Sequence, residues 1–184
     1  MRITAILGSP RAGGNTDLLA AKVLEGASAA GWETESFALR KMSIRPCIGC
    51  GSCWKSERPC VFEDDMGGLY EALARTDALL LATPVYWYAP TALMKAFMDR
   101  LVPFNRPRGR PLIRGKRAIG VIAYEEQGPT AAEPLVRTLE LSFEYLELRQ
   151  AAMVVVDGVG ERGAVLDRPE ALQAAYGVGR GLGG

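Results

Sequence analysis

The sequence lacks histidine entirely, and this absence removes whole classes of chemistry. Without imidazole, the chain excludes Ser-His-Asp and Cys-His catalysis, imidazole zinc sites and proton transfer by a histidine side chain. Difficult chemistry would then come more easily from a bound cofactor than from side chains. We therefore expect no catalytic side chain in the strict sense, and the candidate residues are ones that bind a cofactor.

The sequence also lacks an excess of charge of either sign and any long hydrophobic run. Its 22 basic and 21 acidic side chains nearly cancel, which gives no electrostatic reason to expect nucleic acid or an anionic membrane as a partner. No apolar run approaches the roughly 18 residues of a membrane span. The first residues lack the longer apolar region of a secretory signal. A soluble, cytoplasmic protein is expected.

The length and the hydrophobic pattern indicate a single α/β domain over residues 1–184, with no internal repeat. Short apolar or β-branched runs alternate with segments of helical periodicity, which is typical of a doubly wound parallel sheet. The expected strands are 2–7, 34–39, 78–83, 116–124 and 151–156. The expected helices are 15–30, 65–75, 91–101, 130–146 and 169–176.

Three segments depart from this regular alternation. Residues 45–63, rich in Cys, Gly and Pro, are expected to form an irregular insertion. The glycine-rich tail from about 177 to 184 is expected to be flexible. The basic stretch 106–117 is expected to be a solvated loop, with a site for a nicotinamide nucleotide's phosphate as the alternative. The charged side chains Lys95, Asp99 and Arg100 are expected on a helix surface.

The segment GSPRAGGNT, residues 8–16, joins the first strand to the first helix. A helix N-terminus presents free N–H groups and partial positive charge, which suit a phosphate, and ligands of open α/β sheets bind where the strands end. The segment matches neither a Rossmann glycine motif nor a P-loop. An ordinary turn with Asn15 or Thr16 as helix cap is the alternative. The candidate phosphate ligands are Ser9, Arg11, Asn15 and Thr16.

Consecutive aromatic residues follow the apolar strand ALLLAT, again at a carboxyl end. Exposed aromatics at this place suit a flat apolar ring that needs stacking and backbone donors. The alternative is a surface loop whose aromatics pack on neighbouring helices or across a dimer. The candidate ring contacts are Pro84, Val85, Tyr86, Trp87 and Tyr88. Tyr124, at the end of the expected strand 116–124, is a further candidate.

Four cysteines lie close together at positions 47, 50, 53 and 60. Four thiolates this close in sequence can surround one tetrahedral metal ion or one [4Fe–4S] cluster. The two-residue gaps between the first three are closer to ferredoxin cluster runs than to the paired knuckles of structural zinc. Zinc, a redox-active dithiol and plain packing residues are the alternatives.

Together these segments resemble the flavodoxin-like NAD(P)H-dependent FMN reductases over about residues 1–157. The resemblance rests on GSPRAGGNT, on TPVYWYAPTALMKAFMDR at 83–100, and on the cysteine segment, whose spacing is similar to that of the iron-sulfur flavoproteins. It implies a flavodoxin-like doubly wound three-layer sandwich with a five-stranded parallel sheet. It also implies that residues 8–16 surround the phosphate of FMN and that residues 84–88 contact its ring.

The resemblance further implies an FMN-dependent oxidoreductase that takes electrons from NAD(P)H and passes them to an unknown acceptor. A [4Fe–4S] cluster would have Cys47, Cys50, Cys53 and Cys60 as ligands. A homodimer or homotetramer is implied as well. Two alternatives remain, which are a flavodoxin-type electron carrier without its own nicotinamide substrate and a cofactor-free binding or regulatory module.

Overall fold

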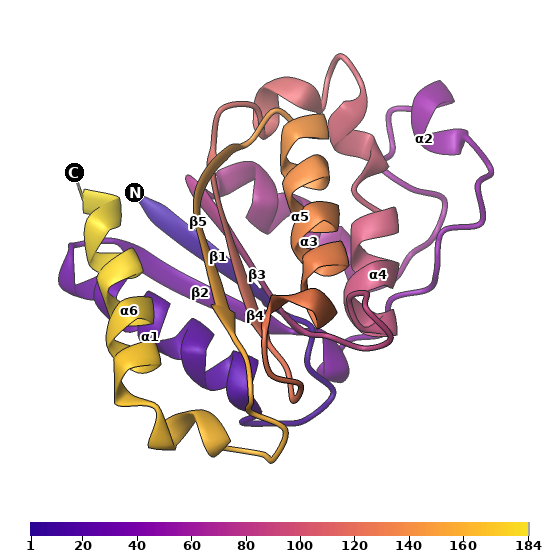
Figure 1. Cartoon of the computed structure of the whole chain (residues 1–184). Helices are drawn as coiled ribbons and strands as arrows, with labels where there is room; N and C mark the ends of the chain where they lie inside the picture. Colours follow the sequence, from indigo (N-terminus) through magenta and orange to yellow (C-terminus); the bar gives the residue numbers. More distant parts are fainter. Residues whose placement is uncertain (184) are drawn as a thin grey trace.

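A computed structural model describes residues 1–183 and shows a parallel sheet of five strands (Figure 1). The strand order is β2-β1-β3-β4-β5, and each pair of neighbours is parallel. This order is that of the flavodoxin-like fold, so the predicted fold class is confirmed. The strands are β1 (Arg2–Leu7), β2 (Glu33–Ala38), β3 (Ala78–Pro84), β4 (Arg117–Ala123) and β5 (Arg149–Val156).

Helices connect the strands, as the alternating pattern predicts, and their ends differ from the expected ones by a few residues. The α-helices are α1 (Asn15–Ala29), α2 (Ser52–Lys55), α3 (Met66–Arg75), α4 (Ala92–Asp99), α5 (Glu133–Tyr145) and α6 (Pro169–Arg180). Short 3₁₀ turns are η1 (Leu39–Lys41), η2 (Val102–Asn105), η3 (Arg110–Leu112), η4 (Pro129–Ala131), η5 (Ala164–Asp167) and η6 (Gly181–Gly183). The insertion between η1 and α3 contains the single turn α2 and is otherwise irregular.

The helices form two layers, one on each face of the sheet (Figure 1). Helices α1 and α6 cover one face, with Leu19 and Val23 of α1 in the apolar cluster on that side. Helices α3, α4 and α5 cover the other, where Leu73, Phe97 and Phe143 are buried. The central strands are apolar on both faces because both are covered, which is why they read as continuous apolar runs.

The beginning of α1 and the end of α6 differ from expectation. Gly14 is the cap residue of α1 and Asn15 its first helical residue, so the prediction that Asn15 or Thr16 caps this helix was wrong. Helix α6 continues to Arg180, although the sequence suggested a flexible tail from about residue 177. Gly179 packs against α1, and this tertiary contact outweighs the low helix propensity of the glycines. Gly184, the last residue of that tail, lies outside the described residues.

Within residues 1–183, no helix is both long enough and apolar enough to cross a bilayer. The expected cytoplasmic location stays a prediction.

Candidate functional site

The strand order brings the predicted loops to one edge of the sheet. Strands β1, β3 and β4 are neighbours, so the loops that follow them lie side by side at the carboxyl ends. The hydroxyl of Thr91 donates to the carbonyl of Gly8 over 2.6 Å and joins the first two of these loops. The residues after β5 complete the edge.

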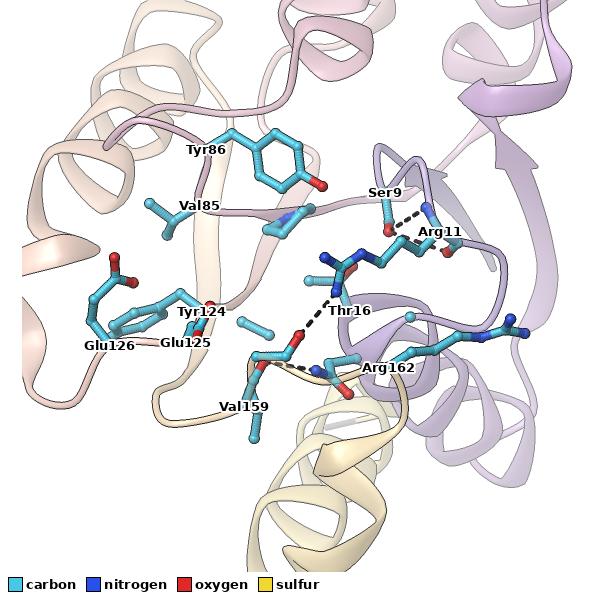
Figure 2. Close-up of a pocket in the computed structure, with 15 residues that line it drawn as sticks. Ser9, Arg11, Thr16, Val85, Tyr86, Tyr124, Glu125, Glu126, Val159 and Arg162 are labelled. Atoms are coloured by element: carbon cyan, nitrogen blue, oxygen red, sulfur yellow. Dashed lines mark hydrogen bonds between the residues drawn. The ribbon is translucent and has the colours of Figure 1, made fainter.

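Two adjoining cavities open at this edge. The first, of about 160 Å³, is lined by all four predicted phosphate candidates and by Pro84, Val85, Tyr86 and Tyr124 (Figure 2). The second, of about 260 Å³, is lined by Trp87 and Tyr88 and shares Val85 and Glu126 with the first. The two cavities form one groove from the predicted phosphate-binding segment to the aromatic turn, and their combined volume lies within the range of small-ligand sites, about 300–1,000 Å³.

Ser9 and Arg11 shape the loop after β1. The Ser9 hydroxyl accepts a hydrogen bond from the Arg11 backbone N–H at 3.1 Å and donates to the Arg11 carbonyl at 3.2 Å. The Arg11 side chain reaches across the cavity and donates to the carbonyl of Gly160 over 2.9 Å (Figure 2). Gly13 has φ +64°, a conformation that glycine adopts without steric cost. The first N–H groups of α1 have no intrahelical partner, so this end suits an anion.

Both N–H groups of the Asn15 side-chain amide donate hydrogen bonds to backbone carbonyls of the protein. Its amide nitrogen donates to the carbonyls of Val159 and Glu161, each over 2.8 Å. Its amide oxygen accepts from the backbone N–H of Val165 over 3.2 Å. An asparagine amide has only two N–H donors, so none is left for a phosphate. Asn15 lines the cavity but holds the loop between β5 and α6, and this differs from its predicted role.

A half-buried ion pair supports the same loop. Arg40 Nη1 is 2.9 Å from the Asp17 carboxylate, which also accepts the Gly13 N–H at 3.1 Å. Burial raises the pKa of Asp17, and the charge of Arg40 opposes this effect. Arg40 Nη1 also donates to the carbonyl of Ser9 over 3.4 Å, so the pair holds the loop after β1 at both Ser9 and Gly13.

The aromatic residues after β3 form a strained two-residue turn. Tyr86 and Ala89 exchange backbone hydrogen bonds of 2.9 and 3.1 Å across the turn. Trp87 and Tyr88 have φ of +51° and +61°, which is uncommon for bulky residues. Trp87 is 94% exposed and Tyr88 58% exposed, so the predicted exposure of the aromatics is confirmed. Such strain is often found at functional sites.

Tyr124 contributes mainly to the core. Its ring is buried in the apolar cluster on the α3–α5 face, and its hydroxyl donates to the carbonyl of Gly128 over 2.8 Å. Burial raises the pKa of this hydroxyl. Tyr124 is only 4% exposed, although it lines the first cavity, so its contact with a cofactor ring stays a prediction.

Sequence reasoning missed the loop between β5 and α6. Val159, Gly160 and Arg162 line the first cavity, and so do the acidic side chains of Glu125 and Glu126. The segment DGVGERG, residues 157–163, directly follows the fifth strand. The rule that ligands bind at strand ends could therefore have identified it.

The four cysteines share a cavity that is separate from this groove. Cys47 and Cys50 are exposed, Cys53 and Cys60 are half-buried, and all are free thiols. They line one apolar cavity of about 30 Å³. Burial raises the pKa of Cys53. In the part of the chain that the structure describes, no group of three or more metal-ligating side chains is arranged to hold a metal ion.

Arg100 lines the cysteine cavity. The prediction that it lies on a helix surface was therefore wrong. It is 2% exposed and binds both oxygens of Asp64, over 2.9 and 3.0 Å. Burial alone would raise the pKa of Asp64, but hydrogen bonds from Arg100 and from backbone N–H groups hold it below its usual value. Arg100 also donates to the carbonyl of Arg45. It thus ties the insertion to the end of α4.

The basic stretch 106–117 is less solvated than expected. Arg106 donates to the carbonyls of Cys53 and Ser56 over 2.6 and 2.8 Å, so it holds the cysteine segment. Arg110 donates to the carbonyl of Tyr145. These arginines bind the protein itself, which does not favour the alternative of a nucleotide-phosphate site here.

The sequence is similar to a known protein family and to individual known proteins. A family model described as NADPH-dependent FMN reductase matches residues 1–160. An iron-sulfur flavoprotein of Archaeoglobus fulgidus is 36% identical over 128 residues, which cover 70% of this chain and 56% of that protein. One of Methanosarcina thermophila is 38% identical over 106 residues, which cover 58% of this chain and 55% of that protein. The chain therefore matches these relatives over only about half of their length.

The fold is also similar to solved structures. An NAD(P)H:quinone oxidoreductase from Methanothermobacter marburgensis has a TM-score of 0.79 at 22% identity, with coverage of 99% of this chain and 96% of that chain. At this level of identity, the similarity supports the fold alone.

Proposed function

Because the chain belongs to the NADPH-dependent FMN reductase family, we propose that it binds FMN in the groove at the carboxyl edge of the sheet and is reduced by NAD(P)H. The observation that carries the proposal is that two adjoining cavities connect a loop whose helix N-terminus suits an anion with an exposed aromatic turn. FMN has a phosphate at one end and a flat ring at the other, and the groove offers a partner for each.

The residues of this chain bind and orient the cofactor. Arg11, the hydroxyl of Thr16 and the N–H groups of α1 would hold the phosphate, with Ser9 shaping their loop. The loop Pro84 to Tyr88 would contact the ring. FMN, when bound, supplies the chemistry of accepting hydride, so no protein side chain needs to react.

The test begins with flavin binding and ends with reduction. Added FMN should lose fluorescence on binding the protein, and the bound flavin should bleach anaerobically with NADPH or NADH. Bleaching by one nucleotide only would also decide which is the donor. Binding without bleaching would favour the electron carrier, and no binding would favour the cofactor-free module.

A [4Fe–4S] cluster at the four cysteines is a finer part of the same proposal. It is supported by the shared cavity of Cys47, Cys50, Cys53 and Cys60 and by the relatives named iron-sulfur flavoprotein. Adjustment of the exposed part of the insertion would be needed to bring the thiols together. The buried Arg100 would lower the electrostatic cost of gathering thiolates there.

Iron and labile sulfide should be measured on anaerobically purified protein and on Cys-to-Ser variants. The proposal predicts about four irons per chain and their loss in Cys50→Ser. Zinc in place of iron, or no metal at all, would contradict it.

We also propose a homodimer or homotetramer, which the exposed Trp87 at the mouth of the groove supports. Analytical ultracentrifugation should give an oligomer mass, and a monomer at micromolar concentration would contradict the proposal.

A further inference from the structure

The loop between β5 and α6 places a second arginine at the phosphate-binding end of the groove. Arg162 lines the first cavity. Its side chain lies on the opposite side of this cavity from Glu126 and points away from it (Figure 2). It lies against the loop after β1, because a Cβ built on Gly13 would be 3.5 Å from Arg162 Nη2. The side chain is exposed and, among residues 1–183, has no hydrogen-bond or ion-pair partner.

The charges along the groove are arranged by sign. Arg11 and Arg162 are at the end formed by the loop after β1, whereas Glu126 follows β4 and also lines the second cavity. Glu125 lies between these ends, against Gly160, whose carbonyl accepts from Arg11. A phosphate is therefore attracted to one end and repelled from the other, since the energy of two charges in a partly dry site is larger than in water. An unphosphorylated ligand would feel no such difference.

The position of Arg162 depends on Asn15. The three hydrogen bonds of the Asn15 side chain go to main-chain atoms of Val159, Glu161 and Val165, on both sides of Arg162. Asn15 is itself the first residue of α1, which follows the phosphate-binding loop directly. One side chain thus fixes the distance between two loops that are far apart in sequence.

We propose that Arg162 adds to Arg11 in giving this site its preference for FMN over unphosphorylated riboflavin, and that Asn15 is the positioning residue that holds the Arg162 loop in place. The inference rests on the proposed FMN function and adds to it the recognition of the phosphate from a second loop.

Titration of FMN and of riboflavin, followed by flavin fluorescence, tests the role of Arg162. Arg162→Gln should weaken FMN binding about fivefold and riboflavin binding less than about twofold, since one charge interaction at an exposed site is lost. Arg162→Lys should recover most of the loss because it keeps the charge. Arg137→Gln, which removes one positive charge from the surface of α5, should leave both affinities unchanged. Added salt should reduce the difference between wild type and Arg162→Gln.

The outcomes separate this inference from the proposed function. If the wild-type protein binds neither flavin, the proposed function fails. If it binds FMN but Arg162→Gln changes nothing, or weakens both flavins equally, the function stands and the role of Arg162 is refuted.

A double-mutant cycle tests Asn15. Asn15→Ala should lower the ratio of FMN to riboflavin affinity. The Asn15→Ala/Arg162→Gln variant should have the same ratio as Arg162→Gln alone, because Asn15 acts through Arg162. Hydrogen exchange should show faster exchange at residues 159–165 in Asn15→Ala. Additive effects on the ratio, or unchanged exchange of this loop, would refute the positioning role. Should Asn15→Ala not fold, Asn15→Asp keeps the acceptor for Val165 and removes both donors, and exchange of the loop is compared in it.

Discussion

The guanidinium of Arg100 and the carboxylate of Asp64 form a buried, two-point ion pair with N–O distances of 2.9 and 3.0 Å. Arg100 follows α4 and Asp64 lies in the cysteine insertion, so the pair fastens the insertion to the sheet layer. A buried charge that loses its partner is costly, and this makes the pair sensitive to substitution.

Asp64→Asn should lower the free energy of unfolding by about 3 kcal/mol at pH 7, because Arg100 stays buried without its counter-charge. The pKa of Asp64 is lower in the folded protein, so its stabilisation is complete above the unfolded pKa of about 3.9 and decreases as the pH falls through the folded value. The difference between wild type and variant should therefore shrink below about pH 4. Urea unfolding at several pH values measures this.

The surface pair of Lys95 and Asp99 provides the matched control. Asp99→Asn should change the stability by less than about 0.5 kcal/mol at pH 7. An equally small effect of Asp64→Asn would show that the buried pair contributes little.

Gly179→Ala should destabilise the protein by at least about 2 kcal/mol, since the new Cβ would lie 2.0 Å from the carbonyl oxygen of Val23. Gly177 is in the same helix with open space around it, so Gly177→Ala should instead stabilise by about 0.5–1 kcal/mol. Thermal unfolding of both variants measures the contact between α1 and α6. Similar effects of the two substitutions would contradict this packing.

Tyr88→Gly should stabilise the protein by about 1 kcal/mol, because glycine adopts φ near +61° without steric cost. It should also weaken FMN binding, since an aromatic surface at the ring end of the groove is lost. Tyr86 has no positive φ, so Tyr86→Gly should lower stability instead and serves as the control. Thermal unfolding and FMN titration are the measurements, and an unchanged FMN affinity would argue against a ring contact by Tyr88.

Arg11→Gln should weaken FMN binding about tenfold, because a charge-assisted contact to the phosphate is worth roughly 1.4 kcal/mol or more. Riboflavin should bind nearly as before. Isothermal titration calorimetry with the two ligands gives the comparison, and equal losses for both would mean that Arg11 shapes the cavity without binding the phosphate.

The sequence by itself determined the order of elements and the two loops that face the groove. Apolar runs long enough for buried strands, each followed by a helical period, leave few topologies, and ligand-binding loops of such sheets follow the strand ends. The segments 8–16 and 84–88 could thus be identified from local patterns. The predicted sheet is confirmed, whereas the binding roles of these residues stay predictions.

Only the tertiary structure decided which polar groups are committed to the protein itself. The Asn15 amide is bonded to residues 159–165, far away in sequence, and Arg100 is buried against Asp64. Gly179 continues a helix because α1 packs on it. A local pattern states what a side chain could bind, but contacts between distant segments decide which of these bonds forms.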